Sequence, residues 1–196
     1  MNLENRDVYS GLSNAAWGYF FLHFDFNLNN VSIFPRFVGW LLLLSACKKL
    51  SGERRDLALL RPLAVLLAAW NTLDWLLSWG GEDVNGHILF LDLLTGVAGL
   101  YFHFQFLTDM AALAERYQPD GAGLDGQLRR RRTLYVVLTT LFSLLGELLE
   151  MLPEHLGEWI AVGMLLAALI AAFLIMAALF RLRRFFREEE AEQPVV

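Results

Sequence analysis

The chain of 196 residues contains one cysteine and five prolines, and its most apolar segment contains no charged residue. With Cys47 as the single cysteine, neither an intrachain disulfide nor a cysteine-based metal cluster can form. The uncharged segment, Trp159–Phe180, has twenty-two residues. As a helix it would span about 33 Å, enough for the roughly 30 Å hydrocarbon layer of a bilayer. Soluble domains of this length have shorter apolar runs, so the sequence predicts a membrane protein.

The sequence also lacks the motifs of common enzyme classes. It contains no Gly-x-Ser-x-Gly nucleophile elbow, no His-Glu-x-x-His zinc motif and no phosphate-binding loop. Its net charge is −5, and it has no basic soluble domain, so we expect no nucleic-acid partner. No particular cofactor is indicated, and we do not expect an enzyme on this basis.

Six apolar segments follow one another, and the basic residues are concentrated in every second gap between them. The predicted spans are about 12–26, 34–47, 60–79, 88–108, 133–152 and 159–180. Fifteen of the sixteen Lys and Arg residues lie before the first segment or after the second, the fourth or the sixth. Because basic loops stay in the cytoplasm, we predict an all-α, multi-pass transmembrane helix bundle with both termini cytoplasmic.

The first two segments are shorter than the others. Phe37–Cys47 has eleven uninterrupted apolar residues, about 17 Å of helix, so Arg36 would have to reach the outer interface for a complete span. Two short spans and a re-entrant hairpin both fit the charge pattern, and we favour the spans. Residues 1–187 should form one helical membrane domain, and the acidic residues 188–196 a disordered cytoplasmic tail.

Polar residues recur at helical spacing on several predicted spans. Asp92, Thr95, Gly99 and His103 form a stripe on the fourth span, and a second stripe on the fifth begins with Thr140 and Ser143. Eight polar residues on four spans fall toward the outer side in this topology, and we select them as candidates for an outer binding pocket. They are His23, Asp25, Asn71, Asp74, Asp92, Thr95, Glu147 and Glu150.

A second interpretation of these acids stays open, because a carboxylate near the end of a span can simply face headgroups and water. A cluster of carboxylates and histidine can bind a divalent cation or take up protons. The spacing matches no defined metal motif, however, so no metal is assigned. For His103, near the inner end of its span, we expect a hydrogen bond that packs helices together.

The cytoplasmic arginines form a separate group. Two basic runs, one before the fifth span and one after the sixth, are expected to contact anionic lipid headgroups of the bilayer. The residues selected are Arg129, Arg130, Arg131, Arg132, Arg181, Arg183 and Arg184. A homo-oligomer or a further membrane partner is also compatible with the sequence.

One stretch resembles a known group of proteins. It runs His23-Phe-Asp-Phe-Asn-Leu-Asn, then Ile33-Phe-Pro-Arg-Phe-Val-Gly-Trp, and ends in Lys48-Lys49-Leu50. This is similar to small multi-pass membrane proteins of Firmicutes, which carry Asp-(Ile/Phe)-Asn-(Ile/Leu) followed by Leu-Pro-Asp-Phe-(Ile/Val)-Gly-Tyr. The resemblance covers about residues 19–50, with Arg36 in place of the usual Asp and Trp40 in place of Tyr. It implies a bacterial plasma-membrane protein and no particular activity.

Three classes of function remain open at this point. The first is a small solute or ion transporter with an acidic pocket open to the outside. The second is a regulatory or interaction protein that docks a partner through its Arg-rich cytoplasmic loops. We rank these two nearly level, and a metal-dependent membrane hydrolase below both.

Overall fold

The computed structural model describes residues 3–24, 27–28, 31–32, 35–79, 89–149 and 153–191. Within these ranges the chain is all-α, apart from one pair of two-residue strands. The elements are α1 (Leu3–His23), β1 (Asn27–Leu28), β2 (Val31–Ser32), α2 (Arg36–Leu50), α3 (Asp56–Leu59), α4 (Arg61–Ser78), α5 (Leu89–Tyr117), α6 (Leu124–Leu149) and α7 (Glu154–Ala191). Each of the six predicted apolar segments falls mainly within one long helix, so the predicted all-α class is confirmed.

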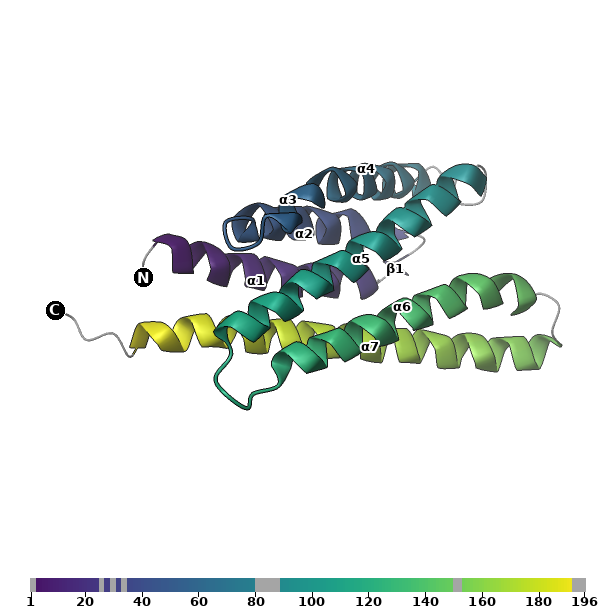
Figure 1. Cartoon of the computed structure of the whole chain (residues 1–196). Coiled ribbons are helices and arrows are strands. Elements are labelled where there is room, and N and C mark those ends of the chain that lie inside the picture. The colour runs from purple at the N-terminus through teal and green to yellow at the C-terminus, as the bar shows by residue number, and fades with distance from the viewer. Residues whose placement is uncertain are drawn as a thin grey trace.

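The long helices run up and down one bundle. Figure 1 shows the two termini at the same end, which is also where the loop between α5 and α6 lies. At this end, α7 packs against both α1 and α6, while α1 packs against α2. We call it the terminal end, and the opposite end, where α4 turns into α5, the distal end.

Local sequence explains the main turns. Asn27 pairs with Ser32 in the antiparallel β1–β2 hairpin between α1 and α2. Pro35, in an extended conformation, directly precedes α2, where its missing N–H costs nothing. Between α5 and α6, Gly121 and Gly123 have φ angles of 81° and 59°, a region that glycine adopts without steric penalty. The side chain of Gln118 then accepts a hydrogen bond of 2.7 Å from the Leu124 amide at the start of α6.

Several helices extend beyond the apolar segments at the terminal end. α1 begins at Leu3, rather than near residue 12, and α5 continues to Tyr117. α7 continues to Ala191, so its last turn includes residues 188–191 of the segment that we expected to be a disordered tail. Residues 192–196 lie outside the described residues. The apolar segments located the helices, but they did not predict where the helices end.

Two helical segments, Asp56–Ser78 and His155–Phe186, are long and apolar enough to cross a membrane. Large apolar side chains are also exposed on the outer faces of α4, α5, α6 and α7, among them Leu76, Leu93, Leu144 and Ile170. Monomeric soluble proteins rarely expose extended apolar patches. Two of the six predicted spans thus pass by length and composition within the described residues, which is weak support for a membrane location.

The buried core is concentrated toward the terminal end. The buried residues of α5 begin at Ala98 and continue to Ala114, and those of α7 begin at Ala171 and continue to Phe186. Most members of both sets lie in the helix halves near the termini. Toward the distal end, α4 and α5 diverge from α6 and α7 (Figure 1). The bundle is therefore packed at one end and splayed at the other.

α1 and α2 cross closely at two glycines. A Cβ atom on Gly39 would lie 2.9 Å from the carbonyl oxygen of Gly18, and one on Gly18 would lie 3.1 Å from that of Gly39. A hydrogen bond of 2.9 Å from Asn14 to Ser45 joins the same two helices. Small residues at such a crossing let two backbones approach closely.

Substituting Gly39 by alanine should separate α1 from α2, because the new methyl group would meet backbone atoms that cannot rotate away. We expect a loss of about 1–3 kcal/mol in the free energy of unfolding, measured by denaturation of the purified protein in detergent. Gly163→Ala is the matched control, since no atom lies within 4 Å of its Cβ position. Equal stability of the two variants would contradict the close crossing.

Candidate functional site

A cavity of about 670 Å³ lies between five helices in the distal half of the bundle. Its lining combines carboxylates, histidines, an arginine and aromatic rings. From α1 and α2 come Leu22, His23, Arg36 and Trp40; from α4, Leu67, Trp70, Asn71 and Asp74; from α5, Asp92, Thr95, Gly96, Gly99, Leu100 and His103; and from α6, Tyr135 and Thr139. A volume of this size suits a small molecule rather than a bare ion.

The cavity brings together five of the eight residues selected from the sequence: His23, Asn71, Asp74, Asp92 and Thr95. Asp25 and Glu150 lie outside the described residues, and the side chain of Glu147 is not among those described. Helical periodicity correctly placed the polar residues of α4 and α5 on a shared face. The role of these residues in binding stays a prediction.

The stripe predicted on α5 lines the cavity along its length, from Asp92 to His103. Gly96 and Gly99 have no atom within 4 Å of their Cβ positions, so they leave space on this wall. Thr95 satisfies its hydroxyl locally, by donating to the Leu91 carbonyl at 2.9 Å.

The stripe predicted on α6 is wrong in its phase. Thr140 and Ser143 are exposed, whereas Tyr135 and Thr139, four residues apart on one face, line the cavity. α6 carries hydroxyl groups on more than one face, so spacing alone did not reveal which face meets α5.

His23 is held by two hydrogen bonds on opposite sides of its ring. Its Nδ1 lies 2.9 Å from the carbonyl oxygen of Tyr19, and its Nε2 lies 3.0 Å from the hydroxyl of Tyr135. Because a carbonyl only accepts, Nδ1 must be the donor. In the neutral ring, Nε2 then accepts from Tyr135. The ring is thereby fixed in one tautomer and one orientation at the edge of the cavity.

The inner limit of the cavity is aromatic. His103, which is 5% exposed, lies 3.0 Å from the hydroxyl of Tyr19, so the expected hydrogen bond between helices is confirmed. Its ring centroid lies 5.3 Å from that of Trp40 and 5.0 Å from that of Tyr135.

The sequence analysis left Arg36, Trp40, Tyr135 and Thr139 out of the pocket. An arginine at a span end and aromatic residues on apolar helices also occur in ordinary packing, so no sequence signal separated them.

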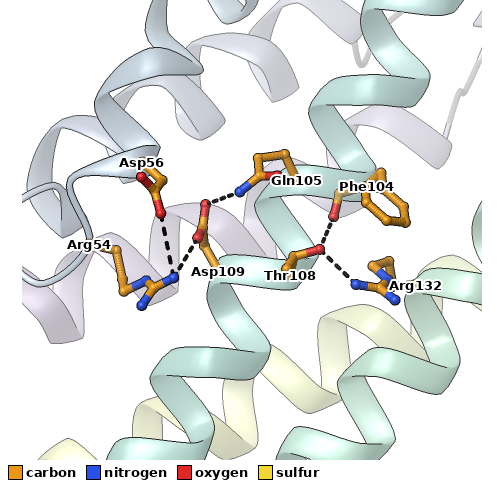
Figure 2. A network of polar contacts seen from close by, with 7 residues as sticks. All are labelled: Arg54, Asp56, Phe104, Gln105, Thr108, Asp109 and Arg132. Atoms are coloured by element: carbon orange, nitrogen blue, oxygen red, sulfur yellow. Dashed lines mark hydrogen bonds and ion pairs between the residues drawn. The ribbon is translucent and has the colours of Figure 1, made fainter.

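Toward the terminal end, a polar network ties α5 to its neighbours (Figure 2). Asp109, fully buried, accepts hydrogen bonds of 3.2 Å from both Arg54 and Gln105. Burial raises the pKa of Asp109, and the hydrogen bonds from Gln105 and Arg54 oppose this shift. Arg132 donates to Thr108 at 2.8 Å, which joins α6 to the same stretch of α5.

The seven arginines selected for lipid contact divide into two groups. Four are engaged by the chain itself: Arg129 pairs with Glu115, the half-buried Arg131 donates to the Leu174 carbonyl, Arg132 lies over the ring of Phe104, and Arg183 donates to Ser13. The other three, Arg130, Arg181 and Arg184, are exposed. The engaged group has a structural use that the sequence did not reveal.

Among the described residues, no group of three or more His, Cys, Asp or Glu side chains could hold a metal ion. The hydrolase interpretation therefore has no supporting observation in this part of the chain. No protein-family model, curated protein or solved structure matches the chain. Its function has to be argued from the cavity and its surroundings.

Replacing Arg54 by glutamine should destabilise the fold by about 1–3 kcal/mol at neutral pH, because the buried Asp109 loses its partner. Asp109 has a raised pKa in the folded chain, so it takes up a proton as the pH falls, and the loss should shrink in acid. Adding Asp109→Asn to this variant should recover part of the stability. Denaturation in detergent at two pH values measures both effects.

Arg129→Gln is the control for this experiment, because its pair with Glu115 is largely exposed and should contribute less than about 1 kcal/mol. A loss in the Arg54 variant that is independent of pH, or that Asp109→Asn does not relieve, would contradict the assigned pairing.

Proposed function

We propose that the chain is a small solute or ion transporter of the bacterial plasma membrane, and that the cavity is its solute site. The observation that carries this proposal is a polar cavity lined by five helices whose other faces expose apolar side chains. Polar groups within apolar helices are costly in a bilayer unless they face one another or water. A shared cavity satisfies that requirement and also provides a binding site.

In this proposal all six long helices cross the membrane, with α3 preceding α4 at the inner surface. The terminal end carries the arginines of α6 and α7, while the cavity lies in the distal half. Since basic ends stay in the cytoplasm, the cavity faces the outside and both termini are cytoplasmic. Six crossings return the chain to the side on which it begins, in agreement with the two termini at one end (Figure 1).

The uneven packing supports an outward-facing state. Buried core residues fill the terminal half, and the Arg54–Asp109 pair joins α5 to the turn before α3 at the same end. The distal halves diverge around the cavity (Figure 1). A transport cycle would require the opposite arrangement, with the terminal half opened and the distal half closed.

The lining favours a positively charged or zwitterionic solute. It contains the carboxylates of Asp74 and Asp92 against the single guanidinium of Arg36. The indole rings of Trp40 and Trp70 on the same walls offer faces that attract cations. Amines and amino acids have this combination of charge and size.

The test is a thermal-stability screen of the purified protein in detergent with amino acids, polyamines, quaternary amines and metal cations. We expect at least one compound to stabilise the wild type, by about 2.7 kcal/mol at a concentration one hundred times its Kd. The shift should disappear in Asp74→Asn and Asp92→Asn. Any compound found is then measured for uptake into proteoliposomes.

Three further variants separate binding from a general effect of charge. Gly99→Leu should fill the cavity without removing a charged group, and should abolish the shift. Gly163→Leu, on the open face of α7, should leave it unchanged, as should Asp120→Asn in the exposed turn before α6. If every compound stabilises these variants and the wild type alike, the cavity is not a solute site.

A further inference from the structure

Two arginines from neighbouring helices lie along one stretch of α7 near the terminal end. Arg131 of α6 reaches across to α7, where its guanidinium donates to the carbonyl oxygen of Leu174. Arg181 lies seven residues further along α7, which places it two turns away on the same face as Leu174. Burial lowers the pKa of Arg131, and the neighbouring charge of Arg181 lowers it further. Both arginines therefore belong to the same stretch of α7, Arg131 through its bond to the Leu174 carbonyl and Arg181 through its place on the helix.

The described residues supply a carboxylate partner to Arg129 but not to this pair of arginines. Arg129, on the same helix as Arg131, pairs with Glu115. In the part of the chain that the structure describes, no carboxylate forms an ion pair with either Arg131 or Arg181. Two guanidinium groups along one face of a helix favour a bound anion, and their planar forks match the oxygens of a phosphate.

An apolar groove begins beside the same pair. It has a volume of about 280 Å³ and is lined by Phe24, which directly follows α1, and by Leu169, Ile170, Phe173 and Leu174 of α7. Leu174 belongs to both features, since its side chain borders the groove and its carbonyl accepts the hydrogen bond from Arg131. From Arg181 to Leu174 the helix rises only about 10 Å. The anion site and the groove thus follow one another along a single face of α7.

We infer that Arg131 and Arg181 form the headgroup site of a tightly bound anionic phospholipid, one acyl chain of which lies in the groove on α7. A phosphate joined to a hydrocarbon chain is the ligand that occupies both features at once. The site lies outside the solute cavity, whose lining includes no residue of α7. The inference needs a membrane environment but not transport.

The experiment uses native mass spectrometry of the full chain, purified in detergent with equal amounts of phosphatidylglycerol and phosphatidylcholine. We expect the wild type to retain one phosphatidylglycerol in preference to phosphatidylcholine. Arg181→Gln should lower that occupancy about fivefold, and Arg131→Gln/Arg181→Gln should lower it further. The single variant also guards against misfolding, because Arg181 is exposed.

The matched control is Arg130→Gln/Arg184→Gln, which removes the same total charge from exposed positions on the same two helices and should keep the lipid. Ile170→Asn/Phe173→Asn should weaken retention of the lipid while leaving both arginines in place.

If the control loses as much lipid as the Arg131/Arg181 variant, the attraction is general and no site exists. Displacement of the lipid by inorganic phosphate alone would make the site one for free phosphate. A dimer without lipid would show that a second copy covers the groove. Either of these last two results would overturn the inference.

Discussion

In the proposed membrane bundle, polar groups on apolar helices avoid hydrocarbon by facing one another, and the arrangement of the bundle follows this constraint. Asp74 on α4, Asp92 on α5 and His23 on α1 lie far apart in the sequence, yet they border one cavity. Large apolar side chains cover the opposite faces of several of the same helices. Polar side chains thus border the cavity, and apolar side chains cover the outer faces. The cavity provides a binding space, and the apolar faces suit lipid.

The two ends of the bundle differ in how closely their helices pack. Near the termini, close packing and the glycine crossing of α1 and α2 hold the helices together, and polar links such as Arg54–Asp109 add cross-connections. Near the distal end, helices separate around an aromatic inner wall formed by Trp40, His103 and Tyr135. In the proposed transporter, a packed terminal half and a divergent distal half would admit a solute from one side only.

Periodicity in the sequence predicted the helices and much of the cavity, because residues three or four apart on a helix must share a face. It located the polar faces of α4 and α5 correctly, but missed the phase of α6, where Thr139 rather than Thr140 faces inward. The crossing of Gly18 and Gly39 was also missed. Two lone glycines far apart in the sequence carry no pattern, and only the tertiary structure brings them together.

The most direct test compares neighbouring positions on α5. Leu93 is exposed on the apolar face and Thr95 lines the cavity, so spin labels at these sites, in a chain with Cys47 replaced by alanine, should report different surroundings after reconstitution into lipid vesicles. Collisions with oxygen should dominate at Leu93, and collisions with a water-soluble nickel chelate at Thr95. Equal access of the chelate to both positions would contradict a water-filled cavity within a lipid-embedded bundle.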